Sequence, residues 1–205
     1  MARPRQVTDA EILSTARDCF LQYGASVSVE TIAERLGISQ PALFRRFGTK
    51  QQLLVQALAP PEVPPWIELL ADGPDQRPFC DQLIELAEHI ALFFDRMVPA
   101  MSVLRCSGIE PETLLQRYAV PPPLRAKHAV TEWLQRARDA GLIRRCAPEV
   151  AARALLGALQ ARSFYAHVLD QHPDDNPQGD AQAVVNLLWD GLAPAETECH
   201  AERDA

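Results

Sequence analysis

The 22 residues from Val29 to Lys50 constrain the fold of this chain more than any other stretch. Apolar residues at positions 29, 32, 33 and 36 recur at helical spacing, and Gly37 follows them, where glycine can adopt the positive φ that ends a helix. Ser39 and Pro41 then favour a second helix, because serine is a good N-cap and proline is tolerated in the first helical turn. The stretch therefore predicts two short helices joined by a tight turn.

The second of these helices is expected to have an inner and an outer side. Leu43 and Phe47 lie four positions apart and should face inward, which leaves outside Gln40, Ala42, Arg45 and Arg46. This pattern is typical of a helix-turn-helix, in which the second helix enters the major groove of DNA. The alternative is an ordinary corner between two helices whose basic face is simply solvated.

The segment Thr8–Leu58 resembles the N-terminal DNA-binding domain of the TetR family of transcriptional regulators. Order, spacing and residue types agree over about fifty positions, at Ile12-Leu13, Ala16, Phe20, Tyr23-Gly24, Ser28 to Ala33, Gly37 to Ser39, Leu43 to Phe47, Lys50 and Leu53-Leu54. The resemblance implies an all-α chain. An N-terminal three-helix helix-turn-helix DNA-binding domain would be followed by a larger helical ligand-binding and dimerisation domain.

The candidate contacts to double-stranded DNA gather in and around the two motif helices. Arg45 is suited to bidentate reading of guanine, and Gln40 lies at the start of the helix, where side chains reach deepest. Phosphate contacts would set register, whereas base contacts would set sequence preference. The full candidate set is Ser28, Ser39, Gln40, Pro41, Ala42, Phe44, Arg45, Arg46 and Lys50.

Individual roles within this set differ. Pro41 and Ala42 are suited to thymine methyl groups, Arg46 to a base or the backbone, and the helix capped by Ser28 to a phosphate at its N–H groups. Lys50 resembles the family's phosphate-clamping lysine. Phe44 stands where many family members carry a tyrosine that contacts phosphate, and it lacks the hydroxyl group for that contact.

The charge of the chain is unevenly distributed. The 205 residues have a formal net charge of −7, but residues 1–58 hold seven Lys and Arg against five Asp and Glu, a balance of +2, and the remainder stands at −9. A mildly basic head on an acidic body favours phosphate contact at the head. Arg3 and Arg5 of the N-terminal arm are further candidates for phosphate or the minor groove, and a frayed terminus is the alternative.

Nothing in the sequence indicates a metal, a cofactor or a catalytic residue. The five cysteines, at positions 19, 80, 106, 146 and 199, lack metal-binding spacing and are expected to be reduced thiols. Arg3 and Arg5 are not followed by the apolar run of a signal peptide, and no apolar stretch reaches the ~18 residues of a membrane span. We therefore expect a cytoplasmic protein without a membrane partner.

The prolines between positions 59 and 65 cannot continue a helix, and they place a domain boundary between a DNA-binding domain, residues 1–58, and an effector-binding and dimerisation domain, residues 59–205. An irregular segment should reach about Arg77, with further interruptions at Pro99, at residues 121–123 and at residues 172–179, and a polar tail from Pro194. The expected body helices are Phe79–Met97, Ala100–Cys106, Glu110–Tyr118, Leu124–Ala140, Pro148 to about Asp170, and a last one capped by Asp180.

The resemblance implies a homodimer and a small-molecule effector. The helix from Pro148 is rich in small residues that let helices approach closely, at 151, 152, 154, 157, 158 and 161, although these faces can equally pack inside one subunit. A two-fold dimer would present two recognition helices to a palindromic operator. Candidate effector contacts, which are equally plain core residues, are Phe93, Phe94, Met97, Met101, Arg105, Tyr118, Trp133, Phe164 and Tyr165.

These observations favour a ligand-responsive dimeric transcriptional regulator, and a repressor in particular. An activator of the same fold is a variant that the sequence does not separate from a repressor. The rivals from other classes are an enzyme that turns over a small molecule in the body, and a helical interaction module whose basic head binds a protein.

Overall fold

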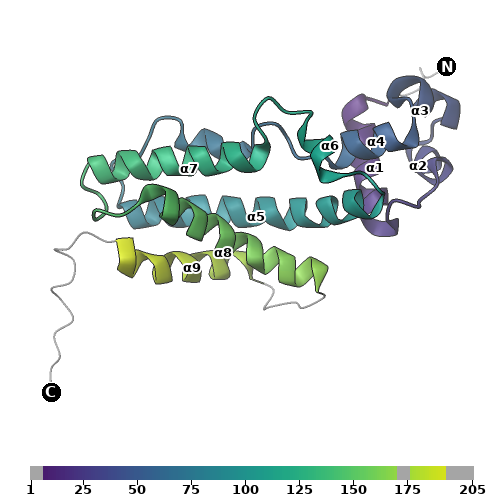
Figure 1. Ribbon diagram of the computed structural model, residues 1–205. Coiled ribbons are helices and arrows are strands. Elements are labelled where there is room, and N and C mark those ends of the chain that lie inside the picture. The colour runs from purple at the N-terminus through teal and green to yellow at the C-terminus, as the bar shows by residue number, and fades with distance from the viewer. Residues whose placement is uncertain (1–6, 170–175, 193–205) are drawn as a thin grey trace, which may run out of the picture. The chain divides into compact units, whose positions relative to one another are not determined.

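The computed structural model describes residues 7–169 and 176–192, and every regular element in these residues is a helix (Figure 1). The all-α prediction is therefore confirmed for this part of the chain. Residues 7–60 together with 97–117 form one compact unit, and residues 61–96 with the remaining described residues form another. The functional boundary between residues 58 and 59 stays a prediction.

The first unit begins with four helices, α1 (Asp9–Tyr23), α2 (Val29–Leu36), α3 (Gln40–Phe47) and α4 (Lys50–Leu58), and it also contains α6 (Pro111–Leu115). Both α1 and α3 pack on α2 and α4. Large core side chains that are at most 1% exposed include Ile12, Phe20, Ile32, Leu43 and Leu53. Each such side chain stabilises the fold by about 1.5–3 kcal/mol relative to an exposed position.

Hydroxyl caps define where these four helices begin. Thr8, Ser28, Ser39 and Thr49 each accept a hydrogen bond from the backbone N–H three residues later. A cap of this kind stabilises a helix by about 0.5–2 kcal/mol. The predicted caps at Thr8, Ser28 and Ser39 are confirmed.

Two glycines shape the turns on either side of α3. Gly37 adopts the left-handed conformation, with φ 66° and ψ 30°, as the sequence predicts for the end of α2. Gly48 follows α3 with φ 75° and ψ −108°. A Cβ atom at Gly48 would collide with Oε1 of Gln52, whereas a Cβ at Gly37 would meet nothing within 4 Å.

The second unit contains the 3₁₀-helix η1 (Pro65–Leu70), the first part of α5 (Phe79–Cys106), α7 (Pro122–Asp139), α8 (Pro148–Val168) and α9 (Pro177–Leu192). α7 packs on η1 and on α8, and α8 packs on α9. The core side chains that are at most 2% exposed include Leu83, Leu86, Ile90, Val130, Leu134, Leu155, Leu159 and Val185.

Aromatic and ionic contacts reinforce this core. Phe79 stacks on Trp133 with ring centroids 4.5 Å apart, and the ring of Trp189 lies 6.3 Å from Phe79. Between α5 and α8, Nη1 of Arg162 lies 3.0 Å from a carboxylate oxygen of Asp95, and the Ser163 hydroxyl donates to the same carboxylate. Because this pair is largely shielded from water, removing one partner would leave an uncompensated charge.

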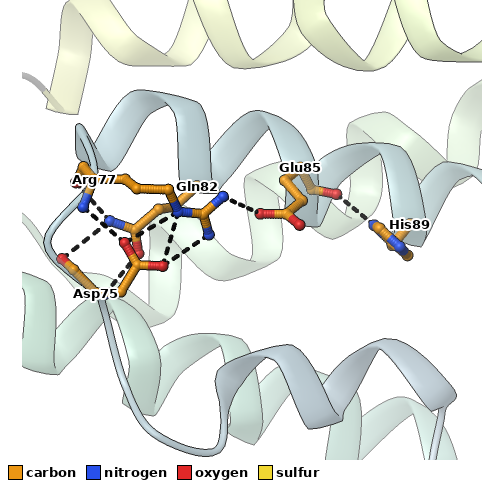
Figure 2. Close-up of polar contacts among 5 residues, drawn as sticks. All are labelled: Asp75, Arg77, Gln82, Glu85 and His89. Atoms are coloured by element: carbon orange, nitrogen blue, oxygen red, sulfur yellow. Dashed lines mark hydrogen bonds and ion pairs between the residues drawn. The ribbon is translucent and has the colours of Figure 1, made fainter.

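The segment that leads into α5 is fixed by hydrogen bonds rather than by regular structure (Figure 2). Buried Gln82 accepts from the backbone N–H of Asp75 at 2.8 Å and donates to the carbonyl oxygens of Asp75 and Arg77 at 3.2 and 2.7 Å. The Arg77 guanidinium lies 2.8 Å from both Asp75 and Glu85, and its hydrogen bonds hold the pKa of the Asp75 carboxyl below its ordinary value. The predicted irregular segment thus has a defined conformation.

Pro99 does not interrupt a helix, and this prediction was wrong. α5 continues through Pro99 to Cys106, so the two helices expected here are one. An internal proline removes one N–H donor and crowds the carbonyl four residues earlier, which destabilises a helix by about 3 kcal/mol. Burial on both sides of the proline opposes this effect, since Ile90 is 0%, Ala100 0% and Leu104 1% exposed.

Prolines also account for other errors at helix ends. α7 begins at Pro122, inside the run expected to break the chain, and α9 begins at Pro177, whereas Asp180, the expected cap, lies in its first turn. Proline is favoured at the first helical position because its φ is already helical and its missing N–H has no partner there. Two further elements differ from the prediction. Residues 65–70 form η1 where irregular chain was expected, and α6 ends at Leu115 rather than Tyr118. Residues 170–175 and the tail from Pro194 lie outside the described residues.

We predict that Gly48→Ala destabilises the first unit more than Gly37→Ala does. The left-handed Gly37 position should cost about 1 kcal/mol on substitution, whereas the Gly48 backbone and the displaced Gln52 side chain should together cost about 2–3 kcal/mol. Urea denaturation followed by far-ultraviolet circular dichroism measures both differences. Equal losses in the two variants would show that the Gln52 side chain moves aside freely.

Candidate nucleic-acid interface

α3 has the two-sided character that the sequence predicts. Leu43 and Phe47 are 1% and 5% exposed and belong to the core of the first unit. The opposite side presents to solvent the side chains of Gln40, Pro41, Phe44, Arg45 and Arg46. The inward and outward orientations are thus confirmed except at Ala42, which was expected outside and is half-buried. Contact of these residues with DNA stays a prediction.

The helix N-termini near α3 carry hydroxyl side chains that are engaged as caps. Ser39 is exposed, and its Oγ accepts from the backbone N–H of Ala42 at 3.4 Å. Ser28 accepts from the N–H of Thr31 at 3.0 Å, and its Oγ lies 2.8 Å from the Thr31 hydroxyl oxygen. A phosphate would meet backbone N–H groups and the positive end of the helix dipole at these N-termini.

Arg45 and Arg46 are neighbours in sequence but differ in environment. Arg45 is exposed and makes no hydrogen bond or ion pair within residues 7–169 and 176–192. Arg46 instead lies 2.8 Å from the carboxylate of Asp9 and donates to the carbonyl oxygen of Val7 at 2.7 Å. This pairing was not predicted from the sequence, because the partners lie almost forty positions apart.

Lys50 is the first residue of α4, and the helix is capped by Thr49, which was not predicted as a cap. Thr49 accepts from the N–H of Gln52 at 3.1 Å, and the Gln52 side chain accepts from the N–H of Thr49 at 2.8 Å. The signal was present, because Thr-x-x-Gln is a capping-box pattern. This reciprocal pair fixes the backbone that carries Lys50, whose side chain is half-buried.

Two other arginines of the first unit have structural contacts. Arg17 donates to the carbonyl oxygen of Ala57 at 3.2 Å and joins α1 to α4. Arg35 donates to the Gln22 side chain at 3.2 Å and approaches the sulfur of Cys19 at 3.5 Å. Arg3 and Arg5 lie outside the described residues.

The nine candidate effector contacts are divided between the two units. Met97, Met101 and Arg105 belong to the first unit, and the other six belong to the second. Within the second unit, Trp133 is buried in the core, Phe93 and Phe94 are partly buried against it, and Tyr118 is half-buried. Phe164 and Tyr165 are 44% and 49% exposed and face each other edge-on at 6.2 Å.

An apolar groove of about 290 Å³ lies among α5, α7, α8 and α9 in the second unit. None of the nine candidate residues lines it. Its walls consist of Leu83, Leu134, Cys146, Ala147, Val150, Ala151, Ala154, Leu155, Leu188, Gly191 and Leu192. Effector contact with the nine candidates stays a prediction.

The described residues contain no group of three or more His, Cys, Asp or Glu side chains able to hold a metal ion. Cysteines 19, 80, 106 and 146 are free thiols, and Cys199 lies outside the described residues. Across residues 7–169 and 176–192, no helix combines the length and apolarity needed to cross a bilayer.

The buried inner side of α3, its exposed basic outer side and the tight turn from α2 define a helix-turn-helix DNA-binding protein. Residues 12–57 match the family model of bacterial regulatory proteins of the tetR family, and residues 82–187 match that of the C-terminal domain of AefR-like transcriptional repressors. The chain belongs to the TetR family of transcriptional regulators.

Relatives and solved structures agree with this assignment. An uncharacterized HTH-type transcriptional regulator of Mycobacterium tuberculosis is 28% identical over 91 residues, which span 44% of this chain and 48% of that protein. The matched region thus covers about half the length of this curated relative. A TetR-family structure from Mesorhizobium loti has a TM-score of 0.69 at 18% identity and covers 90% of this chain and 96% of that one. The regulator PfmR from Thermus thermophilus has a TM-score of 0.59 at 23% identity over 86% and 96% of the two chains.

Substitutions at Ser39 are predicted to separate helix capping from DNA binding. Ser39→Ala removes the acceptor for the Ala42 N–H and should lower the free energy of unfolding by about 0.5–2 kcal/mol. Ser39→Asp keeps an acceptor and should retain stability, but its negative charge beside the exposed side of α3 should weaken DNA binding at least severalfold. Chemical denaturation and fluorescence-anisotropy titration with DNA measure the two effects, and a stable Ser39→Asp variant with unchanged DNA affinity would place Ser39 away from the bound DNA.

Proposed function

We propose that this protein is a dimeric, ligand-responsive transcriptional repressor of the cytoplasm that binds a palindromic operator through α3 and leaves it when a small molecule binds the second unit. The proposal contains no catalytic step. It goes beyond the family assignment in five respects: operator binding by named residues, dimerisation, response to an effector, the sign of regulation and the location in the cytoplasm.

The observation that carries the proposal is the outer side of α3. An exposed glutamine, a proline and an arginine stand on a short helix whose rotation is set by two buried side chains. The arginine, Arg45, has no ion-pair partner in the part of the chain that the structure describes. Gln40 and Arg45 provide the donors and acceptors that read adenine and guanine in the major groove. Lys50 supplies a positive charge at the following helix N-terminus, where a phosphate is favourably placed.

Dimerisation is supported by an exposed apolar surface on α8 and α9. Val150 is 52%, Val168 45% and Leu187 78% exposed, and the small residues Ala154, Gly157 and Ala158 are exposed on α8 between them. Apolar side chains exposed along one helix pair are typical of a protein interface. A two-fold dimer would give each operator two equivalent recognition helices.

Release by an effector is supported by relatives rather than by a filled site. A structural neighbour with a TM-score of 0.53 is a flavonoid-responsive regulator, and another with a TM-score of 0.58 is the secondary repressor of a multidrug efflux pump in Pseudomonas aeruginosa. The matching C-terminal family model also describes repressors. An effector that binds one conformation more tightly shifts the population away from the DNA-binding conformation.

Selection of bound DNA from a random pool at near-physiological salt tests the proposal. The wild-type protein should enrich a palindrome, and Arg45→Ala should lose preference at one position of each half-site, a change worth about 1–3 kcal/mol. Arg117→Ala is the matched control, because it removes the same charge from an exposed position elsewhere in the first unit. Binding without sequence preference would refute the repressor function and direct attention to protein partners.

The proposed dimer is tested with a charge on its apolar surface. Leu187→Glu should convert a dimer into a monomer at micromolar concentration, since a carboxylate buried in an apolar interface is strongly unfavourable. Leu124→Glu, on α7 at 47% exposure, serves as the control and should remain dimeric. Sedimentation velocity distinguishes these states, and a wild-type monomer would contradict the proposal.

A further inference from the structure

Arg46 connects the last turn of α3 to the start of α1. Its Nη2 lies 2.8 Å from Oδ1 of Asp9, the first residue of α1, and its Nη1 donates to the carbonyl oxygen of Val7 at 2.7 Å. The two contacts use different nitrogens of a planar guanidinium, so they restrain the side chain in two directions. A single-donor contact would leave it free to rotate.

This connection adds to the packing that orients α3. The helix has eight residues and buries Leu43 and Phe47, which fix its rotation against the core formed with α2 and α4. Arg46 adds a third contact that restrains α3, this time to Asp9 at the start of α1. α1 also packs on α2 and α4. Arg45 lies in the same last turn of α3 as Arg46, so its direction depends on how that turn is held.

The two arginines also differ in the charge of their surroundings. Asp9 lies against Arg46 and offsets its positive charge, whereas Arg45 has no carboxylate partner among the described residues. A phosphate approaching Arg46 would have to displace both Asp9 and the Val7 carbonyl. A phosphate or base approaching Arg45 would not have to break such a contact with any of the described residues.

We propose that Arg46 is a positioning residue of the DNA-binding head, which holds α3 to the start of α1 through Asp9 and Val7, and that Arg45 makes the base contact. The inference rests on the proposed function of α3 as the recognition helix and deepens it by giving the two arginines separate roles. It revises the sequence-based expectation that Arg46 itself contacts a base or the DNA backbone.

Variants of this pair should remain folded. The side chains of Arg46 and Asp9 are 36% and 65% exposed, and exposed ion pairs contribute little to folding stability. Circular dichroism of each variant verifies this before DNA is added. A loss of DNA affinity in a fully folded variant then reports on the geometry of the head rather than on unfolding.

The experiment is a double-mutant cycle of Arg46→Ala and Asp9→Ala, read out as affinity for the selected operator at several salt concentrations. Each single variant should bind roughly three- to tenfold more weakly, and the double variant should bind no more weakly than Arg46→Ala alone. Base preference and the slope of log K against log salt should stay at wild-type values. Arg45→Ala, in contrast, should lose base preference at one position of each half-site, a change worth about 1–3 kcal/mol. Arg46→Lys, which keeps the charge but not the paired geometry, should recover only part of the affinity.

Other outcomes overturn the inference. A reduction of the salt slope by about 0.9 per recognition helix in Arg46→Ala, together with tighter binding by Asp9→Ala, would show that Arg46 leaves Asp9 for a phosphate. Unchanged affinity in Arg46→Ala would show that the connection does not matter for DNA binding. Both results concern the variants alone and leave the proposed function intact. Absence of sequence preference in the wild-type protein would overturn the proposed function and this inference together.

Discussion

Burial of Leu43 and Phe47 is the interaction on which the DNA-binding side of this protein depends. Both side chains are almost fully enclosed by the first unit, and they lie four residues apart on a helix of eight. A helix this short is unstable in isolation, so its formation relies on tertiary packing. The same packing that makes α3 fold also decides which of its residues face solvent. Stability and the proposed DNA recognition by α3 are therefore coupled through two buried apolar residues.

Local patterns in the sequence were sufficient to predict the first four helices, α1 to α4. The caps at Thr8, Ser28 and Ser39 and the turn at Gly37 follow from preferences of single residues and their near neighbours. The pairing of Arg46 with Asp9 could not be predicted in this way, because it joins elements distant in sequence that meet only after folding. The effector contacts were equally beyond reach, since an aromatic side chain that lines a cavity has the same local pattern as one that fills a core.

The helices that follow α4 show where a local rule conflicts with tertiary packing. Pro99 is a helix breaker by local preference, yet α5 continues because apolar residues on both sides of it are buried. Pro122 and Pro177 illustrate the opposite case, where the favourable position of proline at a helix start was overlooked. Correct limits for these helices needed the number of buried side chains on each segment, which the sequence alone does not supply.

The distribution of tryptophan has a practical consequence for work on this protein. The chain has three tryptophans, Trp66, Trp133 and Trp189, and all belong to the second unit, where Trp133 stacks on Phe79. Intrinsic tryptophan emission is therefore a natural probe of the unit expected to bind an effector. The first unit has no tryptophan, so local unfolding confined to it would be missing from the emission signal. A denaturation curve that appears two-state by tryptophan fluorescence would therefore report the unfolding of the second unit and would not report that of the first.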